Sequence, residues 1–259
     1  IPPGATVTFR WVDATPTNSA GMAIDDFSLT LYPAYTGYFR SRSSGDWNDP
    51  ASWEVSSNGL TWSPATAVVP SGLAAGITIG ENHTITVSGN VTGNQITVLP
   101  GGKLLWSAGT FTIADAPGED LVLQGEGSEW EVATNAVPTL LGAASVRIGQ
   151  GALLKLSGTS QLLAYHGNAY TYANGSVCEY NYAAAPFISG TFFSGQDAGA
   201  IPIFRYNSPV TTSLGSSGPT VVDGGVEIMP GRTFNLNGVG GSLVMRNGLT
   251  GDGHVSSVN

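Results

Sequence analysis

The chain has 259 residues, of which 10% are charged, whereas an ordinary soluble domain carries about a quarter. Its net charge of −9 opposes binding to nucleic acid or to an anionic membrane surface. The single cysteine, Cys178, excludes an intrachain disulfide and a cysteine-based zinc site, and no run approaches the roughly 18 apolar residues of a membrane helix. Gly contributes 36 residues and Pro 15, and no amphipathic helical window occurs, so we expect an all-β fold.

Residues 1–36 carry two strand-like runs, at 5–13 and 21–31, joined by a polar loop. Two strands cannot bury a core, so we interpret this segment as the end of a β-sandwich begun upstream. The pattern FRWVD…GMAIDDFSLTL resembles the closing strands of secreted bacterial jelly-roll modules of the MAM or carbohydrate-binding type. That resemblance implies a structural calcium at Asp25 or Asp26. Two carboxylates fall short of the six to eight ligands that calcium takes, so a solvated Asp pair is the alternative.

Residues 37–76 contain three tryptophans spaced by turn-forming residues, Trp47, Trp53 and Trp62. They could form a platform for stacking on sugar rings or a hydrophobic plug over the end of the domain that follows. A solenoid needs its first coil covered, which favours the plug. We therefore predict that this segment is a linker and cap.

A frame of two alternating strands separated by a Gly turn recurs after residue 76. Residues 96–106 alternate, turn at Gly101 and alternate again. Residues 146–156 and 226–236 fit the frame without a gap, residues 170–180 fit it weakly, and residues 121–132 fit with one insertion. The first members at 96, 121, 146 and 170 are 25, 25 and 24 residues apart.

Self-similarity at such a period is typical of a solenoid, and strands rather than helices in each unit indicate a β-helix. Gly in the frame suits a corner with positive φ. We predict a right-handed parallel β-helix of about seven coils over residues 77–259, continuing beyond Asn259. The capping segment and the sandwich remnant precede it. Chance echoes within another all-β fold are the alternative.

The stretch YFRSRSSGDWNDPASWEVSSNGLTWSPA…ITIGENHTITVSGNVTGNQITVLPGGKL resembles a segment of very large secreted surface proteins of the Bacteroidota. In those proteins a Gly-Asp/Asn-Trp-Asn-Asp-Pro-x-Ser/Thr-Trp motif opens a run of β-helix repeats. The resemblance covers residues 37–132 and implies export by the type IX route, an extracellular location at the cell surface, and adhesion, but no reaction. The pattern positions are Gly45, Trp47, Asn48, Pro50, Trp53, Asn82, His83, Thr84 and Val87.

Polysaccharide lyases and hydrolases also use β-helices, and they need clustered carboxylates with a Lys or Arg. Residues 133–222 hold five charged side chains, and the three histidines lie far apart in sequence. The densest acidic stretch, residues 115–131, is interpreted as a solvated edge rather than a metal site. We predict a non-catalytic structural or adhesive segment that needs no cofactor beyond the calcium considered above. The five charged residues are Arg147, Lys155, Glu179, Asp197 and Arg205.

Carbohydrate binding is the alternative function, because aromatic residues crowd one third of the repeat region. Trp47, Trp53, Trp62, Tyr170 and Tyr172 are the candidate sugar-stacking residues, provided that their rings face solvent. The expected partners are a glycan or cell-surface ligand and further copies of the chain, because open strand edges favour self-association into a filament. The crowded aromatic residues are Tyr165, Tyr170, Tyr172, Tyr180, Tyr182, Phe187, Phe192 and Phe193.

Overall fold

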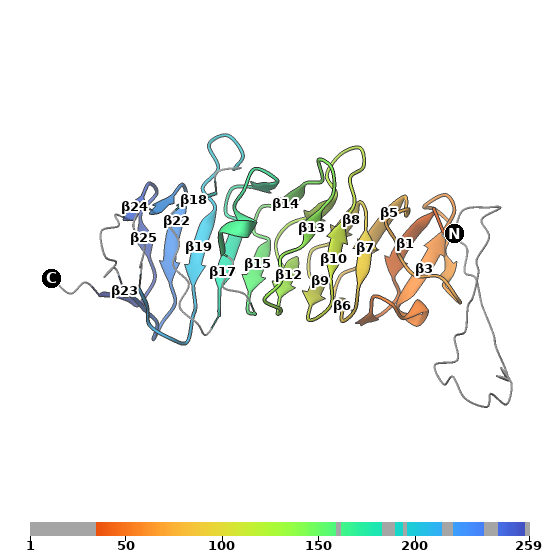
Figure 1. Cartoon of the computed structure of the whole chain (residues 1–259), viewed down its shortest axis with the longest axis horizontal. Helices are drawn as coiled ribbons and strands as arrows, with labels where there is room; N and C mark the ends of the chain where they lie inside the picture. The colour runs from red at the N-terminus through yellow and green to blue at the C-terminus, as the bar shows by residue number, and fades with distance from the viewer. Residues whose placement is uncertain are drawn as a thin grey trace, which may run out of the picture. The chain divides into compact units, whose positions relative to one another are not determined.

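The computed structural model describes residues 35–158, 162–182, 190–193, 196–213, 220–235 and 243–256. These residues belong to one compact unit, Pro33–Asn259. The sandwich remnant predicted for residues 1–36, with its calcium at Asp25 or Asp26, falls almost wholly outside the described residues and stays a prediction. Figure 1 shows the described chain as a stack of short strands, each coil lying against the next.

Sheet A forms one face of the coils. Ile96 pairs with Leu121, and Leu121 pairs in turn with Val146, all in parallel register. The predicted period is therefore the register of adjacent coils, and the predicted parallel β-helix is confirmed. The strands of sheet A, in spatial order, are β16 (Tyr170–Tyr172), β14 (Val146–Ile148), β11 (Leu121–Leu123), β8 (Ile96–Val98), β5 (Gly76–Ile79), β1 (Tyr38–Ser41), β3 (Trp53–Ser56) and β4 (Ser63–Pro64).

Sheet B forms the second face and is the longest, with nine strands that are parallel throughout. Its strands are β2 (Gly45–Asp46), β6 (Thr84–Val87), β9 (Lys103–Trp106), β12 (Glu129–Val132), β15 (Leu153–Leu156), β17 (Val177–Tyr180), β19 (Ile203–Tyr206), β22 (Gly225–Ile228) and β25 (Leu249–Thr250).

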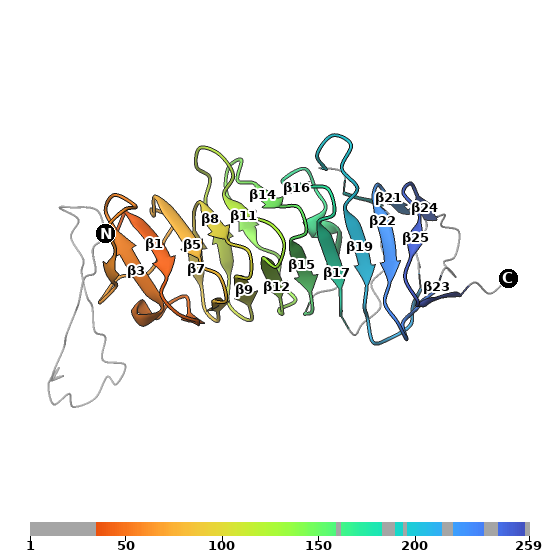
Figure 2. The same ribbon diagram turned by 180° about the vertical axis from the view of Figure 1, so that it is seen from behind.

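Three short sheets complete the coils. Figure 2 shows the same coils from behind. Sheet C contains β7 (Val91–Gly93), β10 (Phe111–Ile113) and β13 (Thr139–Leu140). Sheet D contains β18 (Gly190–Phe192), β21 (Thr220–Val222) and β24 (Leu243–Met245), and sheet E contains β20 (Thr212–Ser213), β23 (Thr233–Asn235) and β26 (His254–Ser256). Among the described residues the helices are two 3-10 turns, η1 (Pro50–Ser52) and η2 (Leu162–Tyr165).

The core consists of columns of inward-facing side chains, because alternate strand residues point to the same face and coils stack in register. Aromatic rings form a continuous chain through this core, each meeting the next edge-on at a centroid distance between 5.5 and 6.1 Å. The chain of rings joins coils that are far apart in sequence. In order, it contains Trp53, Trp47, Phe111, Trp130, Tyr165 and Tyr170.

One corner of the coil, between sheets A and B, requires a left-handed backbone. In five successive coils, the residue at this corner has a positive φ. It stands three positions before the first inward-facing side chain of the sheet B strand. This confirms that Gly in the frame serves a left-handed corner. In the first of these coils Asn82 occupies the corner, and Asn is the residue that best tolerates this conformation after Gly. The five residues are Asn82, Gly101, Gly127, Gly151 and Gly175, with φ between 59° and 79°.

The N-terminal end of the coil stack differs from the rest because its pairing becomes antiparallel. β1 pairs in parallel with β5 but antiparallel with β3, and β3 pairs antiparallel with β4. Trp47 and Trp53 are fully buried here. The indole N–H of Trp47 donates to Pro70 O at 3.1 Å, and that of Trp53 to Trp47 O at 2.9 Å. These two rings plug the end of the core.

The last copy of the frame, residues 226–236, lies on different sheets from the earlier copies. Its first strand belongs to β22 in sheet B, where Val226 pairs with Phe204, and its second belongs to β23 in sheet E. Gly231 still has a positive φ of 72°. The frame therefore encodes a strand, a left-handed corner and a strand, and this local geometry serves at more than one corner of the coil.

Candidate functional site

The outer face of sheet B carries a column of charged side chains of alternating sign, which we call the charge column. Its members stand in register on successive strands, so each faces an opposite charge on the neighbouring coil. In order along the stack, the charge column contains Glu131, Lys155, Glu179, Arg205 and Glu227.

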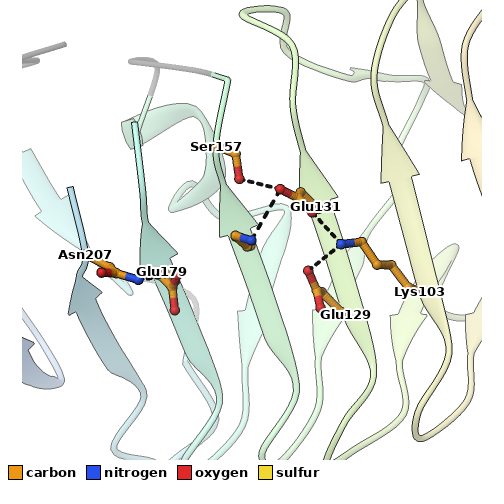
Figure 3. Close-up of polar contacts among 7 residues, drawn as sticks. Lys103, Glu129, Glu131, Ser157, Glu179 and Asn207 are labelled. Atoms are coloured by element: carbon orange, nitrogen blue, oxygen red, sulfur yellow. Dashed lines mark hydrogen bonds and ion pairs between the residues drawn. The ribbon is translucent and has the colours of Figure 1, made fainter. Parts of the chain in front are cut away.

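At the first end of the charge column, Glu131 receives contacts from both neighbouring coils (Figure 3). Lys103 forms a short ion pair with it, and Lys155 Nζ lies 3.4 Å from its Oε1. Ser157 Oγ donates to the same Oε1 at 2.6 Å. Lys103 also lies 3.1 Å from Glu129, directly opposite it in the ladder. The group therefore ties β9, β12 and β15 together.

The charges of this group are held in fixed states. Burial raises the pKa of Glu131, but hydrogen bonds from Lys103 and Ser157 and the charges of Lys103 and Lys155 outweigh it, so the net pKa lies below its ordinary value. Burial lowers the pKa of Lys103, but its hydrogen bonds to Glu131 and Glu129 outweigh burial and raise the net pKa. Glu131 is thus an anion and Lys103 a cation across the neutral pH range.

The other end of the charge column follows the same pattern. Arg205 Nε lies 2.6 Å from Glu227 Oε2, and Arg205 Nη1 lies 3.5 Å from Glu179 Oε2. Asn207 donates through Nδ2 to Glu179 Oε1 at 3.1 Å, as Figure 3 shows, and accepts from Arg232 Nε at 3.1 Å. These side chains link β17, β19 and β22 by the same kind of cross-coil contact.

The predicted sugar-stacking residues are mostly buried, which corrects that prediction. Trp47, Trp53 and Tyr172 are fully buried and Tyr170 is 2% exposed, so none of these four rings can meet a sugar from solvent. They point inward because each occupies a core position of the first coils or of sheet A. Trp62 is half-buried, with the Arg40 guanidinium 4.5 Å from its ring centroid.

The crowded aromatic residues of the repeat region follow the same rule. Six of them are buried core residues and Tyr182 is partly buried, while Phe187 lies outside the described residues. Four of these rings stand at inward positions of strands, whereas Tyr165 lies in η2 and Phe193 directly follows β18. The six are Tyr165, Tyr170, Tyr172, Tyr180, Phe192 and Phe193.

Cys178 and His166 meet inside this aromatic region, although no motif in the sequence pairs them. The Sγ atom of Cys178 lies 3.7 Å from His166 Nε2. His166 also packs against the rings of Tyr172, Phe192 and Phe193. Burial lowers the pKa of His166 to about 3 and raises that of Cys178. A buried thiol that stays protonated is a packing group rather than a nucleophile.

The acidic stretch at residues 115–131 is not a solvated edge throughout, which corrects the sequence interpretation. Asp120 is buried and accepts from the backbone N–H groups of Ala116 at 2.8 Å and Ser145 at 2.9 Å. Asp115 accepts from Ala143 N at 3.0 Å. These carboxylates join loops of adjacent coils. In the described part of the chain, no three His, Cys, Asp or Glu side chains form a group that could hold a metal ion.

The chain matches no protein-family model, and comparisons with the curated proteins and with the solved structures give no match either. Over the residues that the structure describes, no helix is long and apolar enough to cross a membrane.

Proposed function

We propose that this chain is a non-catalytic structural or adhesive segment of a large extracellular bacterial surface protein. The observation that carries the proposal is the charge column, in which acidic and basic side chains bind one another across coils. The five charged residues found at 133–222 are all used in ion pairs: Arg147 with Asp197, Lys155 with Glu131, and Arg205 with Glu179.

The protonation states of Glu131 and its partner Lys103 support a structural role. A general acid or base works best when its pKa lies near the working pH. The pKa of Glu131 is lowered and that of Lys103 is raised, so both move away from neutrality. Such groups fix the register of neighbouring strands and are poorly suited to transferring protons.

The extracellular location rests on the resemblance of residues 37–132 to β-helix segments of Bacteroidota surface proteins exported by the type IX route. The motif residues Trp47 and Trp53 have a structural use here, because both close the end of the core. A motif that covers the first coil of a β-helix is expected where such a segment recurs as a spacer in a long surface polypeptide.

Catalysis is tested by incubating the purified chain with pectin, alginate and other acidic glycans and following chain cleavage. We expect no turnover above a heat-denatured control. Cleavage that disappears in Asp197→Ala or Arg205→Ala would overturn the non-catalytic proposal, since these residues would then act on substrate.

Location is tested with antibodies raised against the purified chain and applied to the bacterium that produces it. We expect labelling of intact cells, removed by brief treatment with external protease. Labelling that requires permeabilised cells would overturn the surface assignment.

A further inference from the structure

A polar hollow lies at the corner where the strands of sheet A end, away from the charge column. It has a volume of about 600 Å³ and opens between the turns of successive coils. The side chains that line it are neutral amides and one ion pair, and its rim contains small residues from the turn 198–200. The polar lining residues are Gln124, Arg147, Gln150, Asn174 and Asp197.

The three amides come from three successive coils, and two of them occupy equivalent positions. Gln124 directly follows β11, and Gln150 and Asn174 each stand two residues after β14 and β16. Neighbouring strands of a sheet are about 4.8 Å apart, so Gln150 and Asn174, which stand in register, follow each other along the stack at about that spacing. Gln124 extends the row to the preceding coil, one residue nearer to its strand. All three are exposed, and Asn174 Oδ1 is fixed by a hydrogen bond from Ile201 N at 3.1 Å. Within the described residues, no protein hydrogen bond engages the side chain of Gln124 or Gln150.

The ion pair beside the row leaves the hollow without free positive charge. Arg147 donates from Nη1 and Nη2 to the two carboxylate oxygens of Asp197, at 3.1 and 2.7 Å. An oxygen of a second carboxylate, Glu119 Oε1, lies 3.6 Å from Arg147 Nη1. One cation therefore faces two anions, so an anionic ligand would be repelled or would have to displace Asp197.

We propose that this hollow binds a neutral oligosaccharide that lies along the row of amides. An amide side chain presents a donor and an acceptor on neighbouring atoms, which matches adjacent sugar hydroxyls that both donate and accept. A ligand made of repeating units can meet an amide on each of these three coils, so its affinity grows with its length. The proposal goes beyond the structural function and does not depend on it. The hollow could bind a glycan whether the chain is a spacer or an enzyme.

The test uses the full 259-residue chain and isothermal titration with cellohexaose, xylohexaose, mannohexaose and maltohexaose, together with the matching disaccharides. We expect at least one hexasaccharide to bind, and to bind more tightly than its disaccharide. The double variant Gln124→Ala/Gln150→Ala should weaken that binding by about tenfold or more, because two hydrogen bonds are lost. Both positions are exposed, so the variant is expected to fold, and its circular dichroism and melting temperature verify this.

The matched control is Asn168→Ala, which removes an exposed amide that does not line the hollow and should leave the affinity unchanged. A second variant, Asp197→Asn, frees Arg147 from its main partner and should create binding to hexagalacturonate. The proposal is overturned if no hexasaccharide binds, if the double variant binds as well as the natural chain, or if the natural chain prefers hexagalacturonate. Cleavage of a glycan by the chain would contradict the proposed function while leaving this inference intact.

Discussion

Single ion pairs on a protein surface contribute little to stability, because water screens them and long side chains lose entropy in forming them. Glu131 differs from that case, since 14% of its side chain is exposed and it has Lys103, Lys155 and Ser157 as partners. Its carboxylate is partly desolvated, so the removal of its charge leaves donors from two other coils without an equivalent acceptor.

Replacing Glu131 by Gln should therefore lower the free energy of unfolding by about 1–2 kcal/mol. Urea denaturation measures the change as a shift of the midpoint at constant m-value. The control is Glu126→Gln, which removes the same charge from an exposed turn residue of the same coil and should change stability by less than about 0.5 kcal/mol. Equal losses in the two variants would show that net charge rather than the local network is responsible.

His166 should make the fold sensitive to acid. Burial lowers its pKa in the folded state to about 3, while the unfolded chain has the ordinary value of 6.5. Above pH 6.5 the residue is neutral in both states and contributes nothing. Between pH 6.5 and about 3 the unfolded state alone binds the proton, so stability falls by up to about 1.4 kcal/mol per pH unit. Denaturation midpoints measured from pH 7 to pH 4 should show this slope.

The matched variant is His166→Phe, which keeps an aromatic ring among Tyr172, Phe192 and Phe193 but cannot take a proton. Its stability should fall less steeply with decreasing pH than that of the natural chain. Identical slopes in both proteins would assign the acid sensitivity to other groups.

At the scale of elements, the unit of this fold is a strand, a left-handed corner and a strand. The corner positions differ in what surrounds them. A Cβ atom built on Gly127 would lie 3.1 Å from the backbone nitrogen of Gly101, whereas one on Gly175 would meet nothing within 4 Å. A substitution at Gly175 therefore measures the free-energy cost of the left-handed backbone without a contribution from close packing.

Gly175→Ala should lower the free energy of unfolding by about 1–2 kcal/mol, because Ala in the left-handed region brings its Cβ too close to the carbonyl oxygen. Gly175→Asn should cost less, since Asn82 occupies the equivalent corner of an earlier coil. The control is Gly225→Ala in β22, where the backbone is not left-handed and the added Cβ also meets nothing within 4 Å. Thermal denaturation of the three variants checks this order, and a Gly225→Ala loss as large as that of Gly175→Ala would contradict it.

The period of the coils was predictable from sequence because each coil repeats one local geometry, and the stacking of Ile96, Leu121 and Val146 follows from it directly. The charge column was not recognised, although aligning the copies places Glu131, Lys155 and Glu179 at one outward position. In the coil of Arg205 the left-handed glycine, Gly199, stands two residues farther from the strand than in the frame, so the frame does not align Arg205 with the other members. Spacing alone does not show whether the aromatic rings point inward or outward. A shift of one residue in the register exchanges the buried and exposed faces of a strand.

At the scale of the whole repeat region, contacts join each coil mainly to its neighbours, so stability is a sum of local units and of the interfaces between them. The chain of aromatic rings crosses these interfaces, with Trp47 at the N-terminal end and Trp130 between coils on both sides. Loss of an end unit removes one interface, whereas loss of a middle unit removes two.

Replacement of either buried tryptophan by Ala should cost about 3–5 kcal/mol, but the region that opens should differ. Trp47→Ala removes the plug at the end, where the first coils can separate without disturbing later ones, so hydrogen exchange should accelerate in β1, β5 and β6 and stay slow in β15 and β17. Trp130→Ala leaves a cavity between two sets of coils, so exchange should accelerate in β9, β12 and β15 together.

Trp62→Ala is the control, because its half-buried ring lies outside the aromatic chain and its loss should leave all of these strands protected. Uniform acceleration across every strand in Trp47→Ala would mean that the coils unfold as a single cooperative unit, and the account in terms of neighbouring coils would then be wrong.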